Sequence, residues 1–307
     1  MEFLYFLEKL RVPVLNEFFL AVTTLGEETA FLALALIFFW CVDKRRGYYL
    51  MAVGFAGTVA SQAMKIACRI PRPWVLDPDF TILEQAREAA SGYSFPSGHT
   101  QTAVGTFGSI AVTAKRKWVA VACVVLAVLV GLSRMYIGVH TPADVIVGAA
   151  LSVFFLIAFH GPMFGKKDRT YPLAIGLGVI TLVYLIVMES VSFPADTDPH
   201  NLESAMKNAY TLFGCMAALL IVYPLEKKYV SFPEKAVWWA QLLKVILGLA
   251  LVLAVKEGLR SPLDALFAGH LAARAVRYFL IVVVAGLLWP MSFRKFADLG
   301  RKKEKNQ

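Results

Sequence analysis

Three short groups of polar residues have the types and spacing to bind a phosphate group and to break its ester bond. In chain order, they are Lys65 with Arg72, then Pro96-Ser97-Gly98-His99, and then Arg134 with His140 and Asp144. Two guanidinium groups and an ammonium group suit phosphoryl transfer, because its transition state spreads negative charge over three oxygens. Two imidazoles and a carboxylate are groups that nucleophilic and acid–base catalysis use.

The tetrapeptide ending in His99 stands directly before an apolar run, which is typical of a helix start. Ser97 is expected to cap this helix, and Gly98 would let the backbone come close to a bound oxyanion. The free N–H groups and the dipole of a helix N-terminus attract anions. His99 would stand in the first turn, beside the same anion. A capped helix with an incidental histidine is the simpler alternative.

His140 and Asp144 are four positions apart, which is about one turn of a helix that Thr141 and Pro142 could begin. The carboxylate could then reach Nδ1 of the imidazole and leave Nε2 as a nucleophile with a free lone pair. Taken alone this pair is weak evidence, since a capping acid beside a surface histidine has the same spacing.

The elements that must position these groups are membrane helices. The chain is 58% hydrophobic and 17% charged, and its mean hydropathy is +0.61. These values, with apolar runs of spanning length, predict an all-α, polytopic membrane bundle. About nine spans are expected after an interfacial segment at 1–27. They lie near 28–42, 48–68, 99–114, 118–138, 142–161, 172–188, 209–224, 237–258 and 275–291.

The charges of the loops predict an orientation. Eighteen of the 31 lysines and arginines fall in alternate loops and in the tail after residue 293, which makes that side cytoplasmic. The net charge of +9 is therefore explained by topology, and we expect no binding to nucleic acid. The N-terminus and the site at 65–144 would lie outside and the C-terminus inside, in what we expect to be a bacterial plasma membrane.

Two parts are expected along the chain: a catalytic bundle with its interfacial helix at 1–165, and added transmembrane helices with a basic tail at 166–307. The four cysteines have no paired spacing and predict neither disulfides nor metal ligands. One carboxylate is too few for a two-metal site, so we expect neither a metal nor another cofactor. The sequence does not indicate an oligomeric state.

The three groups together resemble the three-part signature of the type-2 phosphatidic acid phosphatase (PAP2) superfamily. Six residues separate Lys65 from Arg72, five separate Arg134 from His140, and three more lead to Asp144. The resemblance covers 65–144, about a quarter of the chain, and no signature position departs from it. It implies a core of roughly six helices, beyond which the later spans extend.

The resemblance also implies roles. His140 would attack phosphorus and form a phosphohistidine, Asp144 would orient it, and His99 would protonate the leaving oxygen and then activate water. The phosphate would be held by the remaining signature residues, Lys65, Arg72, Ser97, Gly98 and Arg134. No metal would be needed, and a bell-shaped pH profile would follow from the two histidines.

Three functions are compatible with this pattern. We favour hydrolysis of a phospholipid phosphate or an isoprenoid diphosphate, since the site lies at a membrane surface beside an apolar loop at 74–95. A water-soluble sugar phosphate, as in glucose-6-phosphatases, is the second. The third is a lipid transporter or scramblase that uses Lys244 and the polar group Lys256, Arg260, Asp264, His270, Arg274 and Arg277. We favour the ordinary alternative, in which Lys244 extends to the membrane interface near Trp238 and Trp239 and the other residues form a solvated or interfacial loop.

Overall fold

The computed structural model describes residues 1–87, 90, 92–195 and 197–304, with side chains up to residue 299. Every regular element in these ranges is helical, which confirms the predicted class. The chain packs as two units that alternate along the sequence. Unit 1 comprises Met1–Leu34, Tyr49–Gly161 and Ser192–Ala205; unit 2 comprises Ala35–Tyr48, Pro162–Val191 and Met206–Gln307. The division expected near residue 165 stays a prediction.

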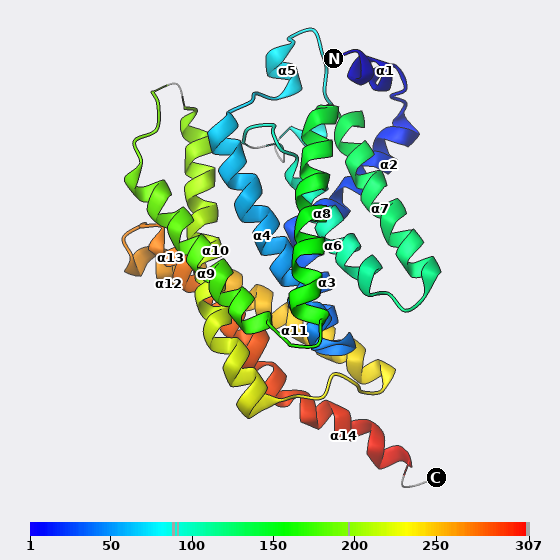
Figure 1. Cartoon of the computed structure of the whole chain (residues 1–307), viewed down its shortest axis with the longest axis vertical. Helices are drawn as coiled ribbons and strands as arrows, with labels where there is room; N and C mark the ends of the chain where they lie inside the picture. The colour runs from blue at the N-terminus through cyan, green and yellow to red at the C-terminus, as the bar shows by residue number, and fades with distance from the viewer. Residues whose placement is uncertain (88–89, 91, 196, 305–307) are drawn as a thin grey trace. The chain divides into compact units, whose positions relative to one another are not determined.

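The helices run in the following order along the chain (Figure 1). The first half contains α1 (Glu2–Lys9), α2 (Pro13–Thr23), η1 (Thr24–Gly26), α3 (Glu28–Ile37), η2 (Phe38–Val42), α4 (Lys44–Cys68), α5 (Pro73–Leu76), η3 (Glu84–Ala86), α6 (Gly98–Thr113) and α7 (Lys117–Tyr136). The second half contains α8 (Pro142–Phe164), α9 (Thr170–Ser190), α10 (Pro199–Leu225), η4 (Glu226–Val230), α11 (Trp238–Gly258), α12 (Arg260–Leu266), α13 (Ala272–Val283), η5 (Val284–Leu288), η6 (Pro290–Ser292) and α14 (Phe293–Glu304).

The predicted count of nine spans is not confirmed. Within the described ranges, seven helical stretches are long and apolar enough to cross a membrane, and α2 with α3, bent by 54°, could be an eighth span. The seven are Lys44–Leu76, Lys117–Tyr136, Pro142–Phe164, Thr170–Ser190, Pro199–Val230, Trp238–Leu266 and Ala272–Leu299. The expected span at 99–114 is α6, whose 16 residues rise about 24 Å, less than a typical hydrocarbon core.

Unit 1 is built around the antiparallel pair α6 and α7, which run side by side in Figure 1. Apolar residues on one face of α7, such as Ala127 and Val130, are buried against α6 in a core with Phe107. The opposite face exposes a row of valines, Val121, Val125 and Val128, as a lipid-facing helix would. The amphipathic helix α1 buries Leu4 against Phe80, Ile82 and Met135.

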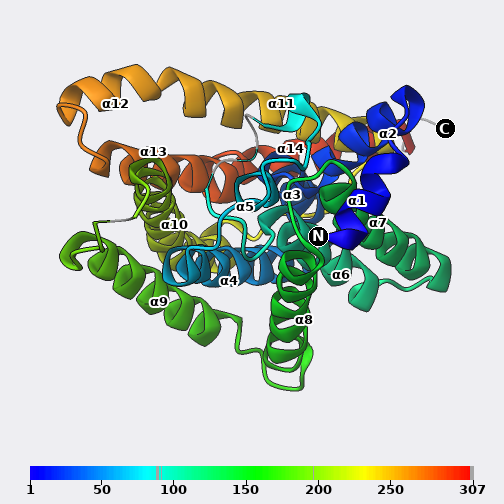
Figure 2. The ribbon, with the colours of Figure 1, turned by 90° about the horizontal axis from the view of Figure 1, so that it is seen from above.

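Unit 2 holds η2, α9, most of α10, and α11 to α14. Helices α11 and α13 run side by side in Figure 2. Lys244 of α11 does not extend toward an interface but is fully buried. Its ammonium donates to the carbonyls of Trp40 (3.0 Å) and Glu234 (2.9 Å) and lies 4.5 Å from the ring of Phe293. The expected extension of Lys244 to the interface is therefore wrong, because backbone carbonyls and an aromatic ring hold its ammonium inside the unit.

Candidate active site

The residues predicted from the sequence meet at one end of unit 1. Lys65 is in the last turn of α4, and Arg72 is the residue before α5. Ser97 and His99 are at the start of α6, and Arg134 is in the last turn of α7. His140 and Asp144 flank the start of α8. Because α6 and α7 are antiparallel, the start of one helix lies beside the end of the other, and residues far apart in sequence come together.

Ser97 caps α6 as predicted. Its hydroxyl accepts hydrogen bonds from the Thr100 hydroxyl (2.9 Å) and the Thr100 N–H (3.4 Å). The Ser97 N–H donates to the backbone carbonyl of Asp144 at 3.0 Å, which ties the start of α6 to the start of α8. A Cβ added at Gly148 of α8 would lie 2.6 Å from the Ser97 carbonyl, so only glycine allows this close approach.

The first turn of α6 has open space beside it. A Cβ added at Gly98 would have no described heavy atom within 4 Å. Open space over a capped helix N-terminus, where N–H groups and the helix dipole both favour negative charge, is suited to an oxyanion.

The contact between His140 and Arg72 determines the tautomer of His140. Nη1 of Arg72 lies 2.9 Å from Nε2 of His140. A guanidinium group has donors and no acceptor, so Nε2 must carry the lone pair and the ring proton of the neutral imidazole must be on Nδ1. A neutral His140 therefore has its free lone pair on Nε2, the atom that the sequence analysis expects to be the nucleophile.

Asp144 faces the other ring nitrogen of His140. Its Oδ2 lies 3.4 Å from Nδ1, which is longer than a strong hydrogen bond. The same oxygen accepts hydrogen bonds from the Ser94 hydroxyl (2.6 Å) and the Thr141 N–H (2.7 Å). The predicted contact between His140 and Asp144 is present, but two further donors fix the carboxylate.

Ser94 is a site residue that the sequence analysis missed. Its hydroxyl lies between Asp144 and His140, at 3.4 Å from Nδ1, and its side chain is fully buried. Its carbonyl accepts a hydrogen bond from the Lys65 ammonium at 3.3 Å. No local pattern in the sequence marked Ser94, because its partner Asp144 is 50 positions away.

Backbone carbonyls hold the buried cations in place. Lys65 also donates to the carbonyl of Tyr93. Arg72 donates through Nη1 to Val139 (2.9 Å) and through Nε to Gly92 (3.0 Å). Neutral carbonyls orient these cations without cancelling their charge, which leaves the charge available to an anion.

Arg134 is fully buried behind the site. Its Nη1 donates to the hydroxyl of Thr23 at 2.7 Å, and its Nε has no partner among the described residues. Thr23, at the end of α2, is a second residue that the sequence analysis missed. Only the folded chain brings it to Arg134, 111 positions away.

His99 is affected by the same buried cations as the rest of the site. It is half-buried, and the charges of Arg134, Arg72 and Lys65 act on it. His99 in turn is close enough to His140 to interact with it electrostatically. The structure therefore brings the two imidazoles near each other, and their membership of one site stays a prediction.

Burial lowers the pKa of His140 well below its usual range, and the nearby charges of Arg72, Arg134 and Lys65 lower it further. The imidazole is therefore neutral near pH 7, which is the form in which Nε2 can attack.

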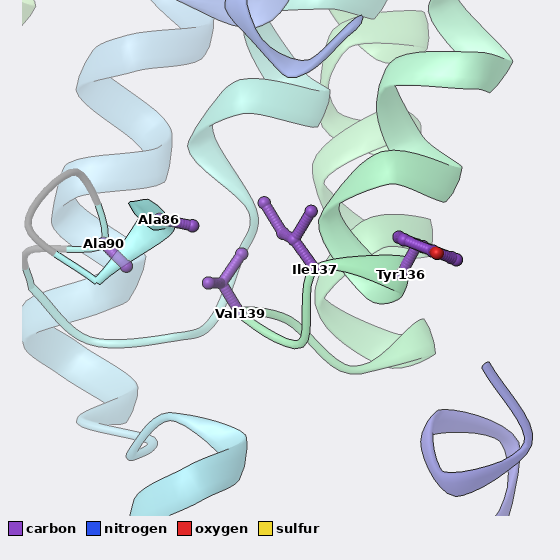
Figure 3. Close-up of a cluster of buried hydrophobic side chains, with 5 residues drawn as sticks. All are labelled: Ala86, Ala90, Tyr136, Ile137 and Val139. Carbon is purple, nitrogen blue, oxygen red and sulfur yellow. The ribbon is translucent and has the colours of Figure 1, made fainter. Parts of the chain in front are cut away.

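A small apolar cluster holds the segment just before His140 (Figure 3). Ile137 and Val139 pack against Ala86 and Ala90.

Within the described ranges, no three side chains of histidine, cysteine, aspartate or glutamate gather at a possible metal site. The expectation of metal-free chemistry stays a prediction.

Comparison with known families matches two models. The PAP2 superfamily model matches residues 45–167, which include every predicted site residue. A second model, the transmembrane extension of PAP2 superfamily phosphatases, matches residues 210–302. No solved structure matches the chain significantly.

Three curated relatives show the range of the similarity. Phosphatidylglycerophosphatase B of Bacillus subtilis (strain 168) is 33% identical over 166 residues, which is 48% of this chain and 76% of the relative. Undecaprenyl-diphosphatase BcrC of the same strain is 30% identical over 131 residues, 41% of this chain and 64% of the relative. Mouse sphingosine-1-phosphate phosphatase 1 is 26% identical over 257 residues, 76% of this chain and 57% of the relative.

The family models, the relatives and the membrane-length helices agree with one another. The chain therefore belongs to the PAP2 superfamily, as an integral membrane phosphatase with the family's transmembrane extension.

Proposed function

We propose that this enzyme removes the terminal phosphate from a membrane lipid phosphate or isoprenoid diphosphate through a phosphohistidine on His140, without a metal. The observation that carries the proposal is the 2.9 Å contact between Arg72 Nη1 and His140 Nε2. This contact supports a lone pair on Nε2, and it holds the Arg72 guanidinium beside the atom that would attack phosphorus.

In the first step, the substrate phosphate takes up the donors of Lys65, Arg72 and Arg134, and Arg72 releases Nε2. The lone pair of Nε2 then forms a bond to phosphorus, while the bond from phosphorus to the ester oxygen breaks. His99 gives a proton to that oxygen, so the lipid leaves as an alcohol, or as a monophosphate if the substrate is a diphosphate. Asp144 stabilises the positive charge that develops on the imidazole ring.

In the second step, His99 accepts a proton from water as the water oxygen bonds to phosphorus. The bond between phosphorus and Nε2 breaks, its electron pair returns to His140, and inorganic phosphate leaves. Ser94 and Thr141 donate to Asp144 throughout, so the carboxylate stays beside Nδ1. Each histidine ends the cycle in the protonation state in which it began.

The relatives support a lipid substrate. Their names give a phosphatidylglycerophosphatase, an undecaprenyl-diphosphatase and a sphingosine-1-phosphate phosphatase, and all three substrates join an apolar chain to a phosphate or diphosphate. The candidate site lies at the ends of membrane-length helices, where a lipid could present its phosphate while its chain stays in the bilayer.

The distribution of charge supports a site on the extracytoplasmic side. The turn between α6 and α7 carries Lys115, Arg116 and Lys117, at the end of the pair away from Ser97 and Arg134. Basic loops of membrane proteins stay in the cytoplasm. The opposite end of this pair, with the site, would then face outward.

The first experiment measures phosphate release by the purified chain from phosphatidylglycerophosphate, phosphatidate, undecaprenyl diphosphate and glucose 6-phosphate. We expect the lipids to be preferred and His140→Ala to abolish hydrolysis of all of them. His200→Ala, which changes an exposed histidine, is the matched control and should keep full activity. A preference for glucose 6-phosphate would contradict the lipid assignment, and hydrolysis that survives His140→Ala would contradict the nucleophile.

A further inference from the structure

Two arginines of α13 have no role in the proposed catalytic mechanism. Arg274 and Arg277 are three positions apart, so their side chains project from adjacent turns on the same face of the helix. Arg277 is only 8% exposed. Helix α13 begins a membrane-length helical stretch, Ala272–Leu299, where a buried cation is costly and usually marks a partner or a function.

Contacts with α10 fix the position of Arg274. Its Nε donates to the hydroxyl of Thr211 at 2.6 Å. The two helices approach closely just beyond this contact, since a Cβ added at Gly214 would lie 2.2 Å from the carbonyl of Ala275. One edge of the Arg274 guanidinium is therefore used to position it, and the remaining donors on its other edge can bind something else.

The charge of the two arginines is not balanced within the described chain. Nε of Arg277 has no hydrogen-bond partner there, and no described carboxylate forms an ion pair with either arginine. Glu189 of the same unit accepts a hydrogen bond from Tyr210 instead. Both guanidinium groups lie near the ring of Tyr278, at 5.5 and 5.7 Å. A buried charge without a counter-charge is unfavourable, and a bound anion would relieve that cost.

We propose that Arg274 and Arg277 bind the phosphate of an anionic membrane lipid, at a site separate from the one that catalyses hydrolysis. Guanidinium groups suit phosphate because their donors match two of its oxygens at once. A lipid fits better than a free anion, because the pair is in the first turns of a membrane-length helical stretch. The neighbouring α12 has no buried residue, and its Leu266 is 75% exposed, which offers an apolar surface to an acyl chain.

Native mass spectrometry of the purified full chain can test this site. The protein is titrated in detergent with phosphatidylglycerol or, separately, with phosphatidylcholine. We expect retention of phosphatidylglycerol, and about tenfold weaker retention in Arg277→Gln and in Arg274→Gln, since each removes charged hydrogen bonds to phosphate. Arg260→Gln, which changes an exposed arginine of α12, is the matched control and should retain the lipid as the unchanged protein does.

Equal retention of both lipids, or loss in Arg260→Gln as large as in Arg277→Gln, would overturn the proposal. Displacement of phosphatidylglycerol by millimolar inorganic phosphate would overturn the choice of a lipid and indicate a site for a free anion. If Arg277→Gln does not fold, the half-buried Arg274 carries the test through Arg274→Gln. The readout is binding, so its outcome is independent of whether the catalytic proposal holds.

Discussion

Lys65 in unit 1 and Lys244 in unit 2 are both buried lysines, and each ammonium donates to two backbone carbonyls. Their surroundings differ. Lys244 lies against the ring of Phe293, and its hydrogen bonds hold η2 and the segment before α11 in place. Lys65 is close to two more cations, Arg72 and Arg134, and one carboxylate, Asp144. Hydrogen bonding alone therefore does not distinguish a structural lysine from one that is poised to bind an anion.

The two lysines differ in the electrostatic free energy that the neighbouring charges add to the fold. Like charges packed together in a region of low dielectric repel one another, so the cluster around Lys65 destabilises the fold until an anion arrives. Among the described residues, no cation acts on Lys244 in this way, and its contacts stabilise the fold directly. Replacing Lys65 with a neutral residue should therefore mainly lower activity, whereas replacing Lys244 should mainly lower stability.

The largest expected effect is on catalysis. Lys65→Met should lower kcat/KM by about 10²–10³-fold, because it removes one preorganised positive charge from the transition state. The thermal midpoint in detergent should fall less than in Lys244→Met, since relief of repulsion with Arg72 and Arg134 offsets the loss of the two hydrogen bonds to backbone carbonyls. If Lys65→Met keeps its activity, or if it unfolds, then Lys65 has a structural role like that of Lys244.

Lys244→Met should have the reverse effect. The carbonyls of Trp40 and Glu234 would lose their buried donor, so the free energy of unfolding should fall by about 2 kcal/mol. A lower thermal midpoint in detergent checks this. Specific activity per folded molecule should change less than twofold. A large loss of activity in folded Lys244→Met would show that the two lysines are not distinct in role.

Ser94→Ala should lower kcat by about tenfold, because Asp144 would lose its hydrogen bond from the Ser94 hydroxyl and hold His140 less firmly. KM should change little, since the three cations remain. Ser94→Thr retains the hydroxyl and should recover part of the rate. Equal activity in Ser94→Ala and the unchanged enzyme would remove Ser94 from the site.

The pH profile gives a finer comparison. Burial, and then the nearby cations, hold the pKa of His140 below its usual range. Because an attacking base must be unprotonated, kcat/KM should fall as the pH drops through that pKa. Lys65→Met removes one of these charges, raises the pKa of His140, and should move the acidic limb up by as much as about one pH unit. Lys244→Met should leave the limb in place. Burial and the same cations also lower the pKa of His99, so the alkaline limb that follows from a protonated His99 should lie at lower pH than an ordinary histidine would give. A monotonic profile would contradict the two roles.

The smallest effect concerns close packing at the start of α8. Gly148→Ala would place a Cβ 2.6 Å from the Ser97 carbonyl, and should cost about 1 kcal/mol in unfolding free energy with a modest loss of kcat. Gly161→Ala, later in α8, would meet no described atom within 4 Å and should have no measurable effect. Equal thermal midpoints for the two variants would show that α8 can shift without cost.

The sequence predicted the part of the site that depends on local spacing. The cap at Ser97, the turn between His140 and Asp144, and the location of Lys65 and Arg134 at helix ends all follow from residues close together in the chain. It could not predict Ser94 or Thr23, because their partners are 50 and 111 positions away. The span count of nine depended on apolar length and on the alternation of basic loops, and α6 is both shorter and more polar inside than the length criterion assumes.

The contact between Arg72 and His140 was also beyond the sequence. Both residues were assigned to the site, but the tautomer was expected to be set by Asp144 alone. The structure adds Arg72 on the opposite ring nitrogen, so both sides of the imidazole are constrained. Which side chains meet across a long loop depends on packing of the whole unit.

The central claim is that Nε2 of His140 becomes bonded to phosphorus during turnover. Rapid quenching of the reaction with ³²P-labelled phosphatidylglycerophosphate tests it most directly, followed by mapping of the labelled peptide. The account predicts an acid-labile, alkali-stable label on His140 that appears before inorganic phosphate and is absent from His140→Ala. Label on another residue, or phosphate release at the full rate with no labelled protein at any time, would contradict it.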